Sequence, residues 1–433
     1  MDSGKKRDVK IAIIGAGASG LSAAHQLKKL GYHEVTVFEK NDYAGGKVLS
    51  YSYRDKYYDL GAVILGKKHN YKNCHELLKE LNIPLERFMT PEIIYIDGNQ
   101  MKFEDYLKEK YSLLSSMKAI LIFFSLRWRF RKYFKNGFAY ASPDLYLNFK
   151  EFIQKYKIVP FADTLQPFFI GCGYGYYEEV PALYLLRMLY WFVRSRLRAQ
   201  GIMRMIEGDK EMDILTCKNG CQELWTKMIK QLHVEVNARI QRIRRDEENR
   251  KIEIFVNGER RTFDRLIISS PLDETIQFMD VSEEEKDLFS KIEYSNYYVT
   301  LFKAKGFDKT VFIRDHVHPS MLGRTVAICR RHPETNVLMG YQITPWEAKP
   351  GEVLENFKED VVQLGGKIEE IIVQKQWRYF PRVKTENLKH NFYQRLDKLQ
   401  GQKGTYYIGA IMNFETVENT IDFAKKLVKN YFN

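Results

Sequence analysis

Residues Val9–Lys47 read VKIAIIGAGASGLSAAHQLKKLGYHEVTVFEKNDYAGGK, and this stretch decides the fold. Val9–Ile14 is mostly apolar and rich in β-branched side chains, which predicts a buried parallel strand. The glycines at positions 15, 17 and 20 predict a tight turn, a close approach of a ligand to the backbone, and close packing of the helix that follows. We expect that helix to extend to about Leu30.

The helix and the next strand complete a nucleotide-binding pattern. The N-terminus of the helix offers unpaired N–H groups and a positive dipole end to phosphate groups. A strand over Glu34–Phe38 ends at Glu39, whose carboxylate can accept hydrogen bonds from ribose hydroxyls. Because these features come in the required order, the sequence predicts a dinucleotide site. The residues expected to bind the dinucleotide are Gly15, Ala16, Gly17, Ser19, Gly20, Glu39 and Lys40.

A second glycine turn indicates which dinucleotide is bound. Gly45-Gly46 comes soon after Glu39, and Gly61-Ala62 follows. This arrangement resembles the extended FAD fingerprint of the flavin amine oxidase superfamily, in which the first pair lies near the phosphates and the second near the flavin. The alternative is an NAD-type unit followed by an ordinary turn; NADP is disfavoured because Glu39 would repel a 2′-phosphate.

The resemblance implies FAD as the cofactor and adds further binding residues. Lys47 stands where the superfamily usually has arginine, so it keeps the positive charge but loses the bidentate fork. The residues added by the resemblance are Gly46, Lys47, Gly61, Ala62, Val63 and Ile64.

Length and composition indicate the number of domains and the kinds of ligand that the protein can bind. A chain of 433 residues is long enough for two domains, each with its own core. The 28 tyrosines and 27 phenylalanines suit either an apolar cavity or an aromatic-rich core. A net charge of +13 suits nucleic acid, a membrane surface or an acidic substrate, but the sequence contains no nucleic-acid-binding module. We therefore expect this charge to serve a membrane surface or an acidic substrate, and no nucleic acid.

The cysteines and the N-terminus indicate the compartment. The five cysteines lack framework spacing, and Cys217 and Cys221 lack the further Cys or His that a zinc site needs, so we expect a reducing environment and no metal. The short, charged N-terminus leads us to expect no signal peptide before the first strand, and no apolar run of the sequence reaches the roughly 18 residues that cross a bilayer. We expect a cytoplasmic protein, with peripheral contact to the inner membrane surface as an open alternative.

The predicted fold class is α/β, with a Rossmann-type FAD-binding domain interleaved with a mixed α+β substrate domain. The FAD-binding domain is expected at residues 1–72, 212–284 and 400–433, and the substrate-binding domain at residues 73–211 and 285–399. A strand over Val234–Ile243 is expected in the first domain. In the second, alternating and apolar runs predict an antiparallel sheet from residues 297–303, 311–314, 326–330 and 337–343.

Two segments of the substrate domain each allow two interpretations. Leu113–Phe124 is an apolar helix followed by alternating aromatic and basic residues over Arg127–Lys132. That pattern suits the headgroup region of a membrane, but we favour an ordinary helix whose arginines lie at its C-terminal dipole end. In Gly171–Tyr177 glycines alternate with aromatic residues, which suits either close contact with a flat ligand or a plain turn between helices.

Three later segments make the resemblance more specific. They are Gly173–Tyr176 with Val180–Ala182, Gln376–Val383 (QWRYFPRV) and Tyr407–Phe414 (YIGAIMNF). Together with the fingerprint, they resemble the polyenoic fatty acid isomerases, nearly from end to end. The regions Ile120–Lys135 and Ala199–Asp213 match that family poorly, which leaves the exact lipid open.

The resemblance implies an internal hydride transfer. Oxidised flavin N5 takes a hydride from the carbon between two cis double bonds, and the same hydride returns to a different carbon to give a conjugated diene. Such a reaction needs positioning and exclusion of water more than acid–base groups. The sequence agrees, because we find no convincing His/Asp or Cys/His pair and no second dinucleotide fingerprint.

The resemblance also implies roles for individual residues. Arg87 is expected to bind the substrate carboxylate, with a plain surface arginine as the alternative. The apolar tail is expected to contact Phe168, Tyr174, Tyr176, Tyr379 and Phe380. Further contacts to FAD are expected from Ile240 on the adenine side and from Trp377, Gly409, Ala410 and Met412 near the flavin.

Two other functions compete with the isomerase. The first is an FAD-dependent oxidase or dehydrogenase of the same fold acting on an amine or another apolar substrate. The second is a protein that holds flavin at the membrane surface without catalysis. The net charge of +13 and the aromatic and basic residues over Phe123–Lys132 suggest it.

Overall fold

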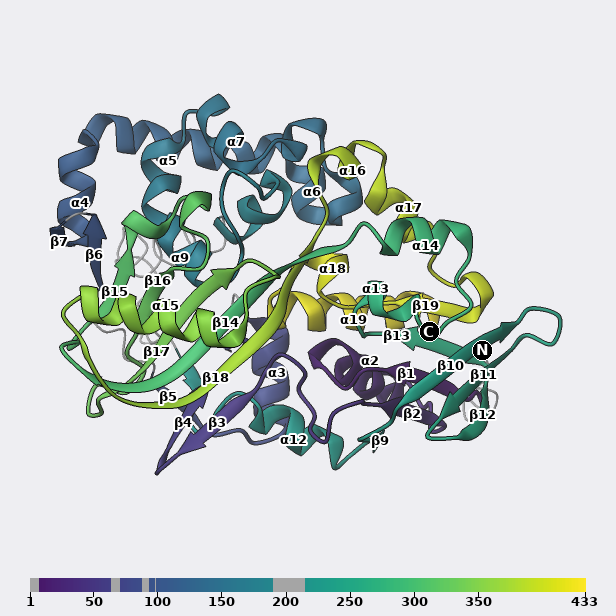
Figure 1. The fold of residues 1–433 in the computed structure, drawn as a ribbon. Coiled ribbons are helices and arrows are strands. Elements are labelled where there is room, and N and C mark those ends of the chain that lie inside the picture. The colour runs from purple at the N-terminus through teal and green to yellow at the C-terminus, as the bar shows by residue number, and fades with distance from the viewer. Residues whose placement is uncertain (1–7, 64–70, 88–92, 98, 190–214) are drawn as a thin grey trace. The chain divides into compact units, whose positions relative to one another are not determined.

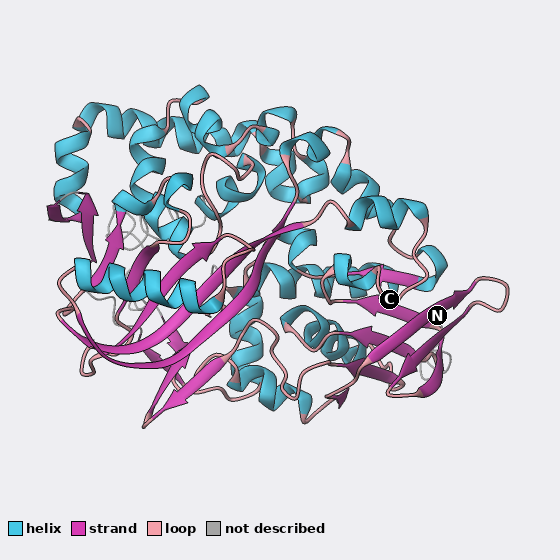
Figure 2. Ribbon diagram, in the orientation of Figure 1, coloured by secondary structure: helices cyan, strands magenta, loops and turns pink. Residues whose placement is uncertain are grey.

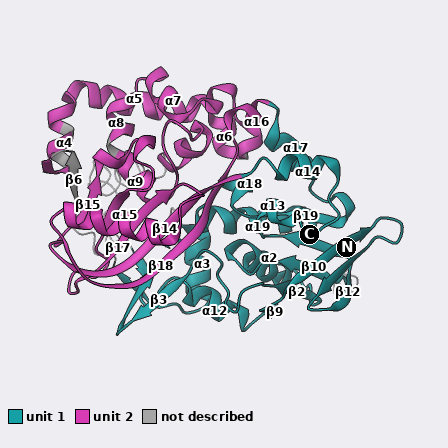
Figure 3. Ribbon diagram, in the orientation of Figure 1, with its two compact units in different colours: residues 1–87, 213–292, 390–433 teal, residues 88–212, 293–389 magenta. Residues whose placement is uncertain are grey.

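The computed structural model describes residues 8–63, 71–87, 93–97, 99–189 and 215–433. The chain folds into two compact units, shown in Figure 3. Unit 1 comprises residues 1–87, 213–292 and 390–433, and unit 2 comprises residues 88–212 and 293–389. Over the described ranges, no helix combines the length and apolarity needed to cross a bilayer.

The unit boundaries differ from the predicted domain boundaries at three helices. Unit 1 includes α3 (Lys72–Glu80), α14 (Glu283–Phe289) and α17 (Phe392–Lys398). Helix α3 is bound to unit 1 because the Asn73 and Cys74 N–H groups donate to the Glu418 carboxylate at 3.0 and 2.9 Å. Helices α14 and α17 are joined by the ion pair between Arg395 and Glu284 at 2.7 Å.

A five-stranded parallel sheet forms the centre of unit 1, in the order β19-β13-β1-β2-β9 (Figure 1). The strands are β1 (Ile11–Ile14), β2 (Val35–Phe38), β9 (His233–Glu235), β13 (Arg265–Ile268) and β19 (Thr405–Tyr407). Every residue of β1 is buried because parallel strands flank it on both sides, which explains its apolar sequence. The structure confirms the predicted α/β class.

Helices and smaller sheets complete unit 1. The remaining helices are α2 (Ala18–Lys29), α12 (Glu223–Ile229), α13 (Leu272–Thr275), α18 (Ala410–Asn413), α19 (Val417–Tyr431) and the 3₁₀ turn η6 (Gln402–Gly404). The remaining strands are the sheet β10 (Ile240–Asp246), β11 (Lys251–Val256) and β12 (Glu259–Phe263), and the pairs β3 (Ser50–Tyr53) with β4 (Lys56–Asp59) and β5 (Leu85–Arg87) with β8 (Leu215–Cys217). The predicted single strand Val234–Ile243 is divided between β9 and β10, because the chain turns at Asn237 with φ of 54°.

A seven-stranded sheet forms the centre of unit 2, in the order β18-β14-β17-β16-β15-β6-β7. Its strands are β6 (Ile93–Asp97), β7 (Asn99–Lys102), β14 (Glu293–Lys305), β15 (Thr310–Ile313), β16 (Thr325–Cys329), β17 (Val337–Thr344) and β18 (Lys367–Arg382). The four predicted antiparallel strands are present as β14 to β17, and β15 also pairs in parallel with β6.

The helices of unit 2 lie beside this sheet and across one of its faces (Figure 2). They are α4 (Phe103–Lys110), α5 (Leu113–Arg129), α6 (Arg131–Asn136), α7 (Phe149–Lys155), α8 (Val159–Ala162), α9 (Gln166–Gly171), α15 (Pro350–Gln363) and α16 (Thr385–Lys389), with residues 182–189 also helical. The 3₁₀ turns are η1 (Phe138–Tyr140), η2 (Pro143–Tyr146), η3 (Asp163–Leu165), η4 (Arg314–His316) and η5 (Pro319–Met321). Phe357 and Val361 of α15 pack with Phe302 and Leu338 in one core on the sheet.

Candidate functional site

The first glycine turn in unit 1 leaves no room for a side chain at Gly15 or Gly20. Gly15 has φ of +103°, a conformation that favours glycine. A Cβ atom at Gly20 would lie 2.0 Å from the Gly15 carbonyl oxygen and 3.1 Å from the Ser269 hydroxyl. The turn between β1 and α2 therefore depends on backbone packing that only glycine permits at these two positions.

The second glycine turn lies against the first. The Gly45 N–H donates to the Ala16 carbonyl at 2.9 Å, and Gly17 and Gly45 form a parallel bridge. Gly46 has φ of +58°, and a Cβ there would lie 3.2 Å from the Gly17 Cα. Two segments that the sequence analysis treated separately thus form one backbone surface.

The N-terminus of α2 has donors that lack partners. Its first turn contains no acidic residue, and the N-cap residue, Gly17, has no side chain that could accept from the first N–H groups of the helix. Within the described part of the chain, the buried hydroxyls of Ser19 and Ser270 have no hydrogen-bond partner. Orphaned N–H and hydroxyl donors beside a positive dipole end fit a pyrophosphate, whose oxygens would accept from them.

Glu39 holds the first turn in place. Its Oε2 atom accepts from the Ala16 N–H at 2.8 Å, and its Oε1 atom accepts from the backbone and side-chain nitrogens of Asn41 at 2.9 and 2.7 Å. The Ala238 N–H donates to the Glu39 carbonyl at 2.8 Å, which brings the segment before Ile240 to the same strand end. Asn41 was not among the predicted site residues, although its position two residues after Glu39 is a signal for a local side-chain hydrogen bond.

The two predicted lysines both contact carboxylates. Lys40 is largely exposed, and its Nζ atom lies 2.9 Å from Glu274. Lys47 forms an ion pair with Glu415, whose side chain is only 9% exposed. Glu415 was also missed, because it lies 368 residues from Lys47 and no local pattern connects them.

The other predicted residues of unit 1 lie at strand ends and loops. Gly61, Ala62 and Val63 are half-buried, and the Ala62 N–H donates to the Lys47 carbonyl at 2.8 Å. Ile240 begins β10, whereas Ile64 lies outside the described residues.

Three of the predicted flavin contacts follow β19. Arg87, which is predicted to bind the substrate carboxylate, lies elsewhere in unit 1. Gly409, with φ of +118°, precedes α18, which contains Ala410 and the buried Met412. Arg87 ends β5, where its backbone pairs with Leu215.

In unit 2 the structure gathers an aromatic cluster, which we define as Tyr174, Tyr184, Tyr297, Tyr341, Tyr379 and Phe380. The ring centroids of Tyr174 and Phe380 are 5.1 Å apart, and those of Tyr297 and Tyr379 are 5.2 Å apart. Three predicted substrate residues, Tyr174, Tyr379 and Phe380, are therefore together, and Tyr297 and Tyr341 were missed. No alternation marked them, because nearly every residue of β14 and β17 is buried.

Glycines let these rings approach the backbone. Gly173 has φ of +82°, and a Cβ there would lie 2.7 Å from Cδ1 of Tyr379 and 3.2 Å from the ring of Tyr297. The Tyr297 hydroxyl donates to the Gly171 carbonyl at 2.6 Å. Phe380 is fully buried and has φ of 55°, a strained conformation for a bulky residue that its packing must maintain.

The remaining candidates of unit 2 lie beside this cluster. Phe168 packs on Phe312, with centroids 6.2 Å apart, in a neighbouring core that also contacts Tyr341. Tyr176 is buried, and its hydroxyl has no hydrogen-bond partner among the described residues. Trp377 is opposite Tyr297 in the pairing of β14 with β18.

The cluster carries no charge at neutral pH. Burial raises the pKa of the Tyr297 hydroxyl well above its usual value, with a smaller effect from Tyr341. Burial also raises the pKa of the Cys172 and Cys329 thiols, each to about 12. Protonated hydroxyls and thiols in an apolar setting suit the binding of a hydrocarbon better than acid–base or nucleophilic catalysis.

Comparison with protein families identifies the chain. The family described as flavin containing amine oxidoreductase matches residues 18–417. The chain belongs to this family. Flavin-containing amine oxidoreductases bind FAD, and FAD is therefore the cofactor. The orphaned donors at the N-terminus of α2 fit its pyrophosphate.

Individual proteins resemble the chain over different shares of its length. The CLA-producing fatty acid isomerase from P. acnes is 26% identical, covers 98% of this chain and 99% of its own, and superposes with a TM-score of 0.86. The FAD-dependent oxidoreductase oblC of Cochliobolus heterostrophus is 24% identical over 92% of this chain and 86% of its own length. The 1-hydroxycarotenoid 3,4-desaturase of a Flavobacterium is 45% identical, but the match spans only 17% of this chain and 15% of the desaturase.

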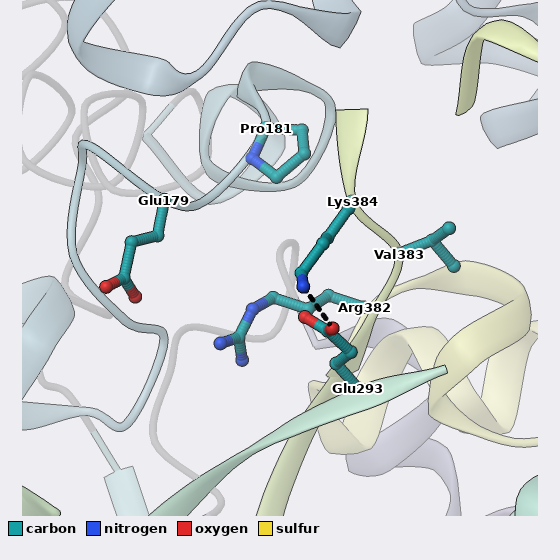
Figure 4. Close-up of a pocket in the computed structure, with 6 residues that line it drawn as sticks. All are labelled: Glu179, Pro181, Glu293, Arg382, Val383 and Lys384. Atoms are coloured by element: carbon teal, nitrogen blue, oxygen red, sulfur yellow. Dashed lines mark ion pairs between the residues drawn. The ribbon is translucent and has the colours of Figure 1, made fainter. Parts of the chain in front are cut away.

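This family member also has a charged pocket in unit 2 (Figure 4). The pocket has a volume of about 340 Å³ and is lined by Glu179, Pro181, Glu293, Arg382, Val383 and Lys384. Lys384 lies 2.8 Å from Glu293, and Arg382 donates to the Ser295 hydroxyl at 2.9 Å. Burial lowers the pKa of Arg382, whereas Glu179 and Glu293 act in the opposite direction. Since two carboxylates balance the two cations, the pocket does not suit a carboxylate ligand.

Proposed function

We propose that the protein is an FAD-dependent isomerase that shifts a double bond in a polyunsaturated fatty acid to give a conjugated diene. The observation that carries this proposal is the end-to-end likeness to the CLA-producing fatty acid isomerase from P. acnes. In the proposed reaction, one hydride leaves the carbon between two cis double bonds and the same hydride is returned to a different carbon. Substrate and product are isomers, so no net oxidant is consumed.

Bound FAD supplies the acceptor and donor of that hydride at N5. We assign the pyrophosphate to the glycine turn, Ser19 and the N-terminus of α2, and the ribose to Glu39. Both oxygens of Glu39 already accept protein N–H groups, which fixes the carboxylate while lone pairs remain for ribose hydroxyls. The other assigned FAD contacts are Lys40, Gly46, Lys47, Gly61, Ala62, Val63, Ile64, Ile240, Trp377, Gly409, Ala410 and Met412.

The aromatic cluster is proposed to hold the hydrocarbon tail. A tail of about 16 apolar carbons, each counted at the ~0.8 kcal/mol of a buried methylene group, would contribute more than ~10 kcal/mol before the entropy of ordering is subtracted. The rings of Tyr174 and Tyr379 carry no charge and keep a small exposed surface, so they can orient a chain and exclude water from its reacting carbon, whereas the fully buried Phe380 supports them from behind. Phe168 and Tyr176 are proposed to extend this surface, and Arg87 to bind the carboxylate.

A second candidate function is net oxidation. The likeness to the FAD-dependent oxidoreductase oblC also spans most of the chain and favours it. An oxidase or dehydrogenase of this fold would remove two hydrogen atoms from an amine or a lipid and would need an acceptor for the electrons.

Product analysis separates the two functions. The purified flavoprotein is incubated with a panel of dienoic and trienoic acids, and the products are analysed by gas chromatography with mass detection. The isomerase predicts products of unchanged mass with conjugated double bonds. Products lighter by two hydrogen atoms, or no conversion of any polyunsaturated acid, would overturn the proposal.

A further inference from the structure

Helix α5 exposes a stripe of large apolar side chains, which we call the α5 face. Leu121 is 70% exposed and Trp128 is 73% exposed, and the others are at least 37% exposed. The α5 face comprises Leu113, Leu114, Met117, Leu121, Phe124 and Trp128. At 100° per residue, all except Leu113 fall within an arc of about 80°, and they extend along about 20 Å of helix. Isolated exposed apolar residues are common on proteins, but a continuous stripe of this kind marks an interaction site.

The opposite side of α5 accounts for its packing within unit 2. Ala119, Phe123 and Leu126 are buried and lie roughly half a turn away from the exposed stripe. A surface helix of a globular protein normally has one apolar side and one polar side. Because α5 is apolar on both sides, packing within unit 2 accounts for only one of them.

The charges on α5 and α6 themselves have one sign, although Asp144 of η2 lies 3.3 Å from Arg129. Residues 113–136 contain six basic residues and no Asp or Glu. The basic residues are Lys118, Arg127, Arg129, Arg131, Lys132 and Lys135. Arg131, Lys132 and Lys135 are exposed on α6, directly after the apolar stripe, and the Arg131 guanidinium lies 5.0 Å from the Trp128 ring centroid. Apolar residues, a tryptophan and a basic cluster therefore follow one another along the surface.

We propose that the α5 face docks on the surface of an anionic lipid bilayer, with its apolar side chains inserted at the level of the acyl chains and the basic residues of α6 at the headgroups. A bilayer fits because its interface offers apolar and anionic groups in this order, and tryptophan prefers that level. A second copy of the chain would present the same basic cluster and repel it. The helix lies on the bilayer, since α5 has only 17 residues and basic residues in its last turn.

This inference does not depend on the isomerase activity, because docking is measured without substrate. The full-length, FAD-bound protein is sedimented with vesicles of phosphatidylcholine alone and of phosphatidylcholine with phosphatidylglycerol. We expect binding to the anionic vesicles that weakens as salt is raised. Binding to neither kind of vesicle would overturn the proposal.

A double variant and a matched control test the α5 face. Leu121→Ser with Trp128→Ser should weaken binding at least about tenfold, because two large apolar groups no longer leave water. The control, Trp346→Ser with Val362→Ser, removes two other exposed apolar side chains of unit 2 and should leave binding unchanged. An equal loss of vesicle binding in the double variant and in the control would contradict docking through α5.

A charge variant tests the basic cluster separately. Arg131→Gln with Lys132→Gln and Lys135→Gln should weaken binding to anionic vesicles at least about tenfold and reduce its dependence on salt. Bound flavin and the thermal midpoint confirm that each variant is folded. If sedimentation without vesicles instead shows a dimer that Leu121→Ser with Trp128→Ser dissociates, the face is a protein interface and the proposal is wrong.

Discussion

Glycine-rich turns occur at Gly15–Gly20 in unit 1 and at Gly171–Gly175 in unit 2, and they use glycine for different reasons. In the first turn the neighbours of an added Cβ are mainly backbone atoms, such as the Gly15 carbonyl oxygen 2.0 Å from Gly20. In the second turn they are side chains, such as Tyr379, 2.7 Å from Gly173, and Val180, 2.8 Å from Gly175. The first turn leaves backbone donors for a ligand, whereas the second lets the protein's own rings fill the space.

This difference separates two kinds of site. The first site is made by backbone geometry and is specified over a short stretch of chain. The second is made by side chains from β14, β17, β18 and the segment after α9. Substitutions in the first turn should therefore affect FAD binding, and substitutions in the second should spare it.

The largest effect is expected for Gly20→Ala. In an ordinary helix this change stabilises by up to ~1 kcal/mol, but here the added Cβ would overlap the Gly15 carbonyl oxygen. We expect a loss of at least ~4 kcal/mol in the free energy of unfolding and purified protein with little flavin. The control is Gly351→Ala, where an added Cβ has no atom within 4 Å. A Gly20→Ala protein that is stable and keeps its bound flavin would contradict this difference between the two turns.

The next largest effect is expected for Gly173→Ala. The alanine must adopt a φ near +82° and displace Tyr379, which should cost about 3 kcal/mol of unfolding free energy. The flavin-to-protein absorbance ratio should stay at the wild-type value, while conversion of fatty acid falls. Loss of flavin from this variant would show that the two turns are not independent.

A smaller effect is expected for Glu39→Ala. It leaves the buried Ala16 N–H without its acceptor, which should lower the unfolding free energy by about 2 kcal/mol and weaken flavin binding. Glu39→Gln keeps an acceptor oxygen and should recover most of the stability in urea unfolding. If both variants lose the same unfolding free energy, the negative charge of Glu39, rather than its hydrogen bond, stabilises the turn.

The smallest effect is expected for Tyr297→Phe. Removing the hydroxyl that donates to the Gly171 carbonyl should cost about 1 kcal/mol in thermal or urea unfolding and leave flavin binding unchanged. Tyr298→Phe is the matched control, because its buried hydroxyl has no partner among the described residues and its removal should cost nothing. Equal costs in the two variants would mean that this hydrogen bond does not hold the second turn.

The nucleotide half of the fold could be predicted because its signals are local. The apolar run, the glycines and Glu39 lie within one strand–turn–helix–strand stretch, and the structure arranges them as expected. What the sequence could not supply are partners from distant segments, such as Glu415 for Lys47 and Glu418 for Asn73. The bond to Glu418 also explains why α3 lies in unit 1 rather than in the predicted substrate domain.

Unit 2 was harder to predict for the same physical reason. Tyr379 meets Tyr297 only because β18 pairs with β14, and no short-range pattern specifies that pairing. The turn at Gly173 had two interpretations, and the structure shows a third arrangement in which the protein's own rings occupy the space beside it. For the helix at Leu113, the sequence revealed its apolar and basic character, but its exposed stripe became evident only with the fold.

The central claim is that FAD in this protein returns the hydride it removes, and anaerobic turnover tests it most directly. The flavoprotein is mixed with excess linoleate in the absence of oxygen, and the flavin and conjugated-diene absorbances are followed together. The account predicts many turnovers of diene per flavin, with oxidised flavin at the end and no peroxide when air is admitted. Flavin that is bleached after a single turnover, with diene formation resuming only as oxygen is consumed mole for mole, would contradict it.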